Sequence, residues 1–283
     1  MRLSNNKIKI ILAFILLSFA SFKPAETTWT AIGDSITYLN DHLDETGNRV
    51  TKGYLTRTVA QLPNLKYINQ GHNGWTAVRV AREIDNLGLT KTDIYSVLLG
   101  TNDWWAGLPL GSLDDYKNNT GLNTVCGAYR IIINKIKSLN LGAKIILITP
   151  LQRGDFVYVA HPQNNATGSY HAKNGQWLSQ FAAAVNQIGK YEHFKVVDLY
   201  HKSGINISNA VKFKMLKDPL TGAYKNYKYP DYKGITFDPA ADKYPYPIEA
   251  INYTYDGLHP SDQGNEKIAA MLAKKMRAAI GED

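Results

Sequence analysis

The sequence predicts an α/β fold in which a doubly wound, parallel, five-stranded sheet carries helices on both faces. Short apolar runs alternate along the chain with longer runs of helical period. Several of the short runs are apolar on both faces, as strands of a buried parallel sheet are. The right-handed crossovers between parallel strands then place helices on both sides of the sheet.

The predicted elements alternate regularly. Five short apolar runs are predicted strands, at residues 28–32, 67–69, 94–99, 144–148 and 195–199. Five segments with apolar residues at helical spacing are predicted helices, at residues 55–62, 77–84, 122–139, 178–188 and 268–276. The helix at 122–139 contains Cys126, the only cysteine, so no internal disulfide can form. Its place in the apolar stripe predicts a buried side chain and not a nucleophile.

The first residues form a separate segment. Arg2, Lys7 and Lys9 precede an apolar run over residues 10–22, which suits a secretory signal peptide and is short for a membrane span. We expect residues 1–25 to be that signal, with the mature start between residues 21 and 27, and residues 26–283 to form one domain. The protein is then secreted or periplasmic without a stable membrane anchor, and an uncleaved anchor is the alternative.

The charge of the chain is mildly positive. The formal net charge of +8 falls to about +5 when the three basic residues of the signal segment are removed. No dense block of Lys and Arg is present, which favours a solvated basic surface over a nucleic-acid site. Nucleic acid is therefore not an expected partner.

Polar loops follow the first three predicted strands, and another precedes the last helix. They contain Ser35, residues 69–74, residues 100–103 and residues 256–260. Ligands of open parallel sheets bind beyond the carboxyl ends of the strands, so we expect these loops to share one rim.

The loops together contain the parts that acyl transfer requires. That chemistry needs a hydroxyl, a base, a carboxylate that orients the base, and donors for the oxyanion. The candidates are Ser35 as hydroxyl, His259 as base, Asp256 as carboxylate, and Asn102 with the backbone N–H groups of Gly74 and Ser35 as donors. The three-residue spacing from Asp256 to His259 permits a compact turn through Gly257, and Pro260 is expected to open the last helix.

The four motifs resemble the sequence blocks of the SGNH/GDSL hydrolase family. They are Gly33-Asp34-Ser35, the Gly74 loop, Gly100-x-Asn102-Asp103 and Asp256-x-x-His259, in family order, and they frame residues 29–280. The resemblance implies a flavodoxin-like three-layer fold, Ser35 as nucleophile, Gly74 and Asn102 as oxyanion donors, and Asp256 with His259 completing the triad. The Gly-x-Ser-x-Gly motif of the rival α/β-hydrolase fold is absent from the sequence.

Other candidate groups carry weaker signals. His72 is a rival base but has no carboxylate three or four residues away, so a neutral hydrogen-bonding role is expected. Asp34 and Asp103 are expected chiefly to hydrogen-bond within their loops. The sequence has no His-x-x-x-His motif or paired Cys/His cluster, so we expect neither a catalytic metal nor a cofactor.

A Tyr/Pro-rich insertion at residues 200–255 suggests the substrate. It holds nine of the eighteen tyrosines, is poor in Leu, Ile and Met, and is predicted to be an ordered excursion near the site. Candidate substrate contacts are Asp34, Trp104, Trp105, Tyr244 and Tyr246. Aromatic rings with polar handles suit sugars, so the expected substrate is a small-molecule or polysaccharide ester, and the expected activity is that of a carbohydrate esterase removing acetyl or similar groups. The alternatives are a lipase, lysophospholipase or thioesterase of the same family, or a glycan-binding protein without catalysis.

Overall fold

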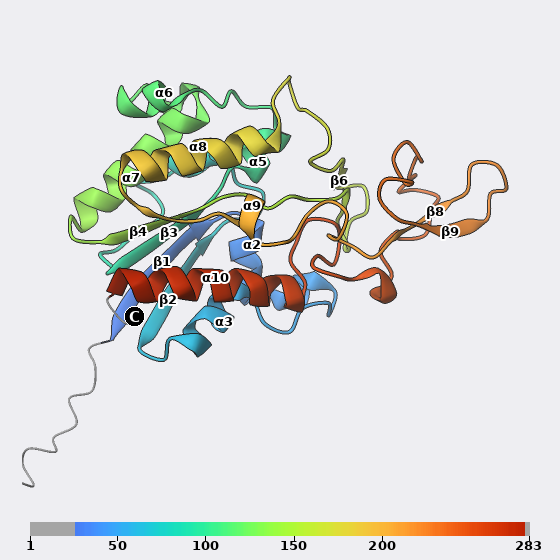
Figure 1. Cartoon of the computed structure of the whole chain (residues 1–283), viewed down its shortest axis with the longest axis horizontal. Helices are drawn as coiled ribbons and strands as arrows, with labels where there is room; N and C mark the ends of the chain where they lie inside the picture. The colour runs from blue at the N-terminus through green and yellow to red at the C-terminus, as the bar shows by residue number, and fades with distance from the viewer. Residues whose placement is uncertain (1–25, 281–283) are drawn as a thin grey trace, which may run out of the picture.

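Five parallel strands form the centre of the fold in the computed structural model, which describes residues 26–280 (Figure 1). The strands are β1 (Thr27–Gly33), β2 (Leu65–Gly71), β3 (Ile94–Leu98), β4 (Lys144–Ile148) and β7 (Lys195–Val197). Their order is β2-β1-β3-β4-β7, and all four pairings are parallel. The chain therefore builds the sheet outward from β1 in both directions, which confirms the doubly wound prediction and places a switch point between β1 and β3.

Helices cover both faces of the sheet, as the sequence predicts (Figure 1). One face packs against α4 (Ala77–Arg82), α7 (Val125–Leu139) and α8 (Leu178–Tyr191). The other packs against α3 (Tyr54–Gln61) and α10 (Asp262–Ile280). Along β3, Tyr95 and Val97 join the first core while Ile94 and Leu98 join the second. This strand is buried on both faces, which is why its sequence is a continuous apolar run.

Short elements connect these layers. The short α-helices are α2 (Ser35–Tyr38), α5 (Thr101–Trp105), α6 (Leu113–Lys117) and α9 (Leu199–Lys202). The 3-10 turns are η1 (Leu39–Asp41), η2 (Leu43–Thr46), η3 (Gly121–Asn123) and η4 (Ile248–Ala250). Two small antiparallel pairs complete the structure, namely β5 (Phe156–Val157) with β6 (Asn165–Ala166), and β8 (Lys214–Lys217) with β9 (Tyr224–Tyr227).

Capping side chains explain where the observed elements depart from the predicted ones. The strand predicted to reach residue 199 ends at Val197, because the Asp198 carboxylate caps α9. The helix predicted from residue 122 begins at Val125, because the Thr124 hydroxyl caps it. The prediction that Pro260 opens the last helix is wrong: α10 begins at Asp262, and the Ser261 hydroxyl accepts a hydrogen bond from the Gly264 N–H at 3.4 Å.

The structure describes the whole insertion at residues 200–255, which contains a hairpin where no strand was expected. The β8–β9 hairpin extends away from the sheet beyond the carboxyl ends of the strands (Figure 1). Among residues 26–280, no helix is both long and apolar enough to cross a membrane. The predicted signal peptide lies outside the described residues.

Candidate active site

Ser35, His259 and Asp256 form one chain of hydrogen bonds at the carboxyl end of β1. Ser35 is the first residue of α2, and its Oγ lies 2.9 Å from His259 Nε2. On the other side of the imidazole, Nδ1 lies 2.7 Å from Asp256 Oδ2. A carboxylate only accepts hydrogen bonds, so Nδ1 carries the proton and Nε2 is the acceptor for the serine hydroxyl. The arrangement can therefore remove the serine proton during attack on a carbonyl.

A tight turn holds Asp256 and His259 in this geometry. The Asp256 carboxylate is fully buried, and its Oδ1 accepts from the backbone N–H groups of Leu258 at 3.0 Å and His259 at 2.8 Å. Gly257 has a φ of +91°, and a Cβ at that position would lie 1.8 Å from the Asp155 carbonyl oxygen. Glycine is thus required by both the backbone angle and the close approach.

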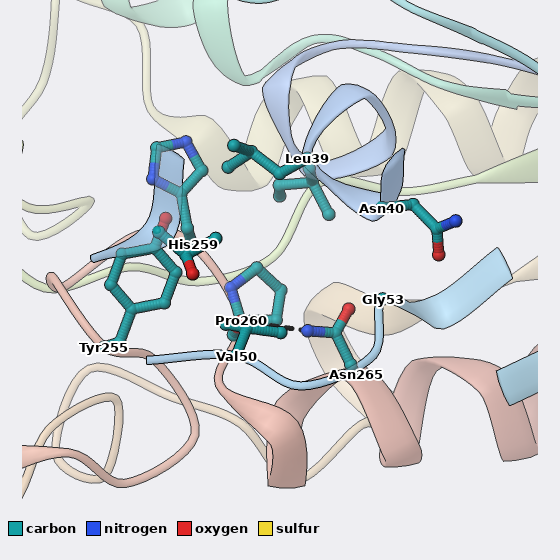
Figure 2. A pocket seen from close by; sticks show the side chains of 10 residues that line it. Leu39, Asn40, Val50, Gly53, Tyr255, His259, Pro260 and Asn265 are labelled. Atoms are coloured by element: carbon teal, nitrogen blue, oxygen red, sulfur yellow. Dashed lines mark hydrogen bonds between the residues drawn. The ribbon is translucent and has the colours of Figure 1, made fainter. Parts of the chain in front are cut away.

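Two aromatic rings fix the imidazole plane. Tyr255 stacks on His259 with a centroid separation of 5.8 Å, and Phe156 meets it edge-on at 5.3 Å. Figure 2 shows the Tyr255 and His259 rings beside each other at the wall of a small buried cavity. This cavity of about 10 Å³ can hold little more than one water molecule, so it is not a substrate pocket. Asn265 of α10 donates to the Pro260 carbonyl at 3.0 Å and ties the histidine loop to the helix.

The predicted oxyanion donors lie around the same serine. Gly74 has a φ of +73°, the left-handed conformation that glycine adopts readily. Asn102 belongs to α5 after β3, and its Nδ2 donates to the Trp75 carbonyl at 3.0 Å, which orients the amide. Both residues line the pocket that contains Ser35 and His259. Acyl transfer requires hydrogen-bond donors near the nucleophile, and the position of both residues in this pocket is compatible with that role.

The pocket over the serine is small, and its lining combines polar and apolar side chains. Its volume is about 240 Å³. Besides Ser35, Gly74, Asn102 and His259, it is lined by Asn73, Thr76, Trp105, Ala106, Arg153, Phe156, Asn164, Ala166 and Leu258. This volume is below the range typical of pockets that enclose drug-sized ligands.

Asp34 and Asp103 are buried carboxylates with hydrogen-bonding roles in their loops. The Asp34 side chain accepts from the Ile36 N–H at 3.0 Å, and Asp103 accepts from the Ala77 N–H at 2.8 Å and the Val78 N–H at 3.3 Å. Burial raises the pKa of each carboxyl to about 6. Asp34 does not line the pocket that contains Ser35 and His259, so the structure does not support its prediction as a substrate contact.

The predicted aromatic contacts divide by burial. The Trp104 and Tyr246 side chains are fully buried and do not line the pocket, so the structure does not support their prediction as substrate contacts. Trp104 donates from its indole N–H to the Gln176 carbonyl at 3.1 Å, and Tyr246 donates to the Asp155 carbonyl at 2.5 Å. Tyr244 donates to the Val157 carbonyl at 2.9 Å and is not part of the pocket lining. Of the predicted aromatic contacts, Trp105 alone lines the pocket.

The remaining candidates stand apart from the hydrogen-bond chain. His72 stacks on Trp75 with a centroid separation of 4.1 Å, and partial burial together with the Arg79 charge lowers the pKa of its imidazole. Cys126 is buried in α7, and burial raises the pKa of its thiol to about 12. Within residues 26–280, no cluster of His, Cys, Asp and Glu side chains is arranged to hold a metal ion.

Sequence reasoning missed the pocket residues that follow β4. Arg153 and Phe156 both line the pocket, and they follow β4 in the chain. The topology could have indicated them, because the carboxyl end of the fourth strand lies on the same rim as the other loops. The predicted site included only the loops with recognisable motifs.

The sheet has a flavodoxin-like strand order, and the hydrogen-bond chain from Ser35 through His259 to Asp256 is the arrangement that serine hydrolases use. A family model of GDSL-like lipases and acylhydrolases matches residues 31–267, and the chain belongs to that family. Ester hydrolysis is the activity that this membership implies.

Solved structures agree with this assignment. A protein from Chitinophaga pinensis DSM 2588, described as a possible lipase, is 62% identical with a TM-score of 0.89, over 91% of this chain and 100% of that one. A Lactobacillus plantarum protein, 20% identical with a TM-score of 0.58, shares the fold over 90% of this chain and 98% of its own. A carbohydrate esterase family 3 protein from Talaromyces cellulolyticus, 17% identical with a TM-score of 0.50, also shares the fold, over 91% of this chain and 99% of its own. No curated protein matches the chain.

Proposed function

We propose that the protein is an exported serine esterase that removes acetyl or similarly small acyl groups from a carbohydrate. The observation that carries the catalytic part is the continuous contact from Ser35 Oγ through His259 to the buried Asp256 carboxylate. The export part rests on the signal-like residues 1–25.

In the proposed reaction, His259 Nε2 takes the hydroxyl proton as Ser35 Oγ attacks the ester carbonyl. The Asn102 amide and the backbone N–H groups of Gly74 and Ser35 stabilise the negative oxygen of the tetrahedral intermediate. His259 then protonates the departing sugar hydroxyl, which leaves an acyl group on Ser35. Water, activated by the same imidazole, hydrolyses that acyl-serine and restores the enzyme.

The pocket supports a small acyl group and a polar leaving group. Its side chains include Asn73, Thr76, Asn102, Arg153 and Asn164, which offer hydrogen bonds suited to a sugar. The aliphatic side chains in the lining are the short Ala106 and Ala166 with Leu258. A long acyl chain requires a larger apolar groove than these residues provide.

Acetate release from acetylated polysaccharides by the wild type and by Ser35→Ala tests the proposal. The wild type is expected to release acetate, and the variant, which keeps the pocket but lacks the nucleophile, is expected to release none above background. Hydrolysis of p-nitrophenyl esters that depends on Ser35, without acetate release from any glycan, would contradict the carbohydrate part alone.

A lipase is the second candidate function, because the 62% identical Chitinophaga pinensis protein is described as a possible lipase. Comparing p-nitrophenyl acetate with p-nitrophenyl palmitate separates the two. A kcat/KM that increases with chain length would favour the lipase and contradict the small-acyl proposal. A protein that binds glycans but shows no esterase activity, as wild type and as Ser35→Ala alike, would be a binding module.

A further inference from the structure

The geometry points to Arg153 as a specificity residue that binds a carboxylate of the substrate beside the scissile ester. The substrate is then an acylated acidic sugar, such as a uronic acid unit of a polysaccharide. This inference rests on the proposed function and names the substrate class for the same pocket.

Arg153 is a buried side chain with unused donors. Its side chain is 1% exposed and lines the pocket together with Ser35 and His259. Nη2 donates to the Thr167 carbonyl at 2.9 Å, whereas Nε is buried without a hydrogen-bond partner. A guanidinium has five N–H donors, and within residues 26–280 this one interaction is the only side-chain hydrogen bond that Arg153 makes.

The positive charge of Arg153 has no direct counter-ion in the described part of the chain. No carboxylate lies within 4.0 Å of its guanidinium among residues 26–280. Asp155, close to it in sequence, is engaged with Lys214 Nζ at 2.8 Å and the Tyr170 hydroxyl at 2.5 Å. Asp256 is engaged with His259. Both carboxylates already have partners of their own.

Arg153 remains charged at neutral pH despite this environment. Burial lowers the pKa of the guanidinium to about 10, which still leaves it protonated. Its Cζ lies 5.3 Å from the Trp104 ring centroid and 5.2 Å from that of Trp105, and these cation–π contacts supply part of the lost hydration. Asp155 and Asp256 favour this charge at longer range, but neither contacts the guanidinium, so a bound anion would supply the direct counter-ion that Arg153 lacks.

A carboxylate fits the donor set better than other ligand groups. The planar guanidinium can donate two parallel hydrogen bonds to one carboxylate. The pocket lining contains no Asp or Glu side chain that would repel such a group. Because the same 240 Å³ pocket contains Ser35 and Arg153, the carboxylate and the ester must lie within one sugar residue or on adjacent ones.

A matched pair of polymers tests the inference. Acetylated polygalacturonate carries a free carboxylate on each unit, and methyl esterification of the same polymer removes that charge while leaving the acetyl groups. We expect the wild type to deacetylate the charged polymer with a kcat/KM about 10- to 100-fold higher, the range of a charge-assisted hydrogen bond. Equal values for the two polymers would overturn the inference.

Variants locate the preference in Arg153. Arg153→Met is expected to bring the charged polymer down to the level of its methyl ester, and Arg153→Lys to retain part of the preference. Arg82→Met removes an exposed arginine of α4 and is the control for general loss of positive charge. Retention of the full preference by Arg153→Met, or its equal loss in Arg82→Met, would contradict the assignment.

Two further measurements keep the outcomes distinct. Hydrolysis of p-nitrophenyl acetate, which lacks a carboxylate, reports whether Arg153→Met still folds and catalyses. If that variant fails to fold, the wild-type comparison of the two polymers still decides the inference. Acetate release from neutral acetylated xylan at the rate of polygalacturonate would overturn the acidic-sugar inference alone, and no release from either polymer would overturn the carbohydrate proposal as well.

Discussion

Replacing Asp256 by asparagine changes which ring nitrogen of His259 carries the proton. The asparagine side chain is almost the same size as the aspartate it replaces. The amide oxygen can keep both backbone bonds, from Leu258 N–H and His259 N–H, which are 3.0 and 2.8 Å in the wild type. The amide nitrogen then faces His259 Nδ1, where Oδ2 now lies at 2.7 Å. Because that nitrogen is a donor, Nδ1 must become an acceptor, and the ring proton moves to Nε2. His259 then cannot accept the Ser35 proton.

The expected loss is large for catalysis and small for folding. A histidine held in the wrong tautomer lowers kcat by about 10⁴, which corresponds to about 5.4 kcal/mol of barrier. One charged hydrogen bond becomes a neutral contact, which costs about 1–2 kcal/mol of unfolding free energy. Domains of this kind have an unfolding free energy of about 5–15 kcal/mol, so the variant stays folded. KM should change little, because Asp256 does not line the pocket.

The assay is steady-state hydrolysis of p-nitrophenyl acetate, with thermal unfolding measured on the same samples. Asp198→Asn is the matched control, since Asp198 and His201 have the same spacing and an Oδ1 to Nδ1 distance of 3.0 Å. That pair lies outside the pocket, so its loss should leave kcat within about twofold. An Asp256→Asn variant that retains a tenth of wild-type kcat would refute the reasoning. So would additive effects of Asp256→Asn and Ser35→Ala, because groups that act as one unit are not additive.

Three further changes test other parts of the site. Gly257→Ala should lower both Tm and kcat, because its Cβ would meet the Asp155 carbonyl at 1.8 Å; wild-type Tm and kcat would count against the tight turn. Asn102→Ala should lower kcat on p-nitrophenyl acetate by about 10²- to 10³-fold with little change in KM, and a change confined to KM would show that the amide only binds substrate. The third change concerns the pKa of about 6 that burial gives the Asp34 and Asp103 carboxyls, against 3.8 when unperturbed. The native state binds their protons more tightly than the unfolded state, so both groups lower stability as pH rises from about 4 through 6. In urea unfolding at pH 4 to 7, Asp103→Asn should therefore gain stability relative to wild type as pH rises, and a difference independent of pH would show that the carboxyl does not titrate in this range.

The sheet and its main helices were predictable because burial leaves a direct mark on the sequence. β3 is buried on both faces and its sequence is a continuous apolar run, whereas α7 shows its core-facing stripe at helical spacing. The boundaries were less predictable, because they depend on single capping side chains such as those of Thr124 and Asp198. The β8–β9 hairpin was missed because its strands are short and polar, with no periodic apolar pattern.

The Asp-x-x-His spacing predicts a catalytic pair only when it is combined with the other motifs of the site. Asp198 and His201 repeat the Asp-x-x-His spacing and form a similar hydrogen bond, but the His201 side chain is half exposed. His259 differs because it is buried and contacts a serine 224 positions away in the sequence. That long-range contact follows from the parallel sheet, which brings the loop after β1 to the rim where the last helix begins. Residue type alone also misplaced Trp104 and Tyr246, since an aromatic ring is as useful in a core as in a binding site.

The Tyr/Pro-rich insertion supports the histidine loop through the segment that follows β4. Tyr246 donates to the Asp155 carbonyl, the same oxygen that lies against Gly257, while the Asp155 carboxylate is paired with the buried Lys214. The backbone N–H of Val157 donates to the Asp256 carbonyl at 3.1 Å, so the segment after β4 is fixed to the insertion on one side and to the catalytic turn on the other. The sheet alone places the serine and the oxyanion donors. The imidazole is placed by chain segments outside the sheet, and Tyr246 of the insertion, which is buried and hydrogen-bonded to the Asp155 carbonyl, is part of this support.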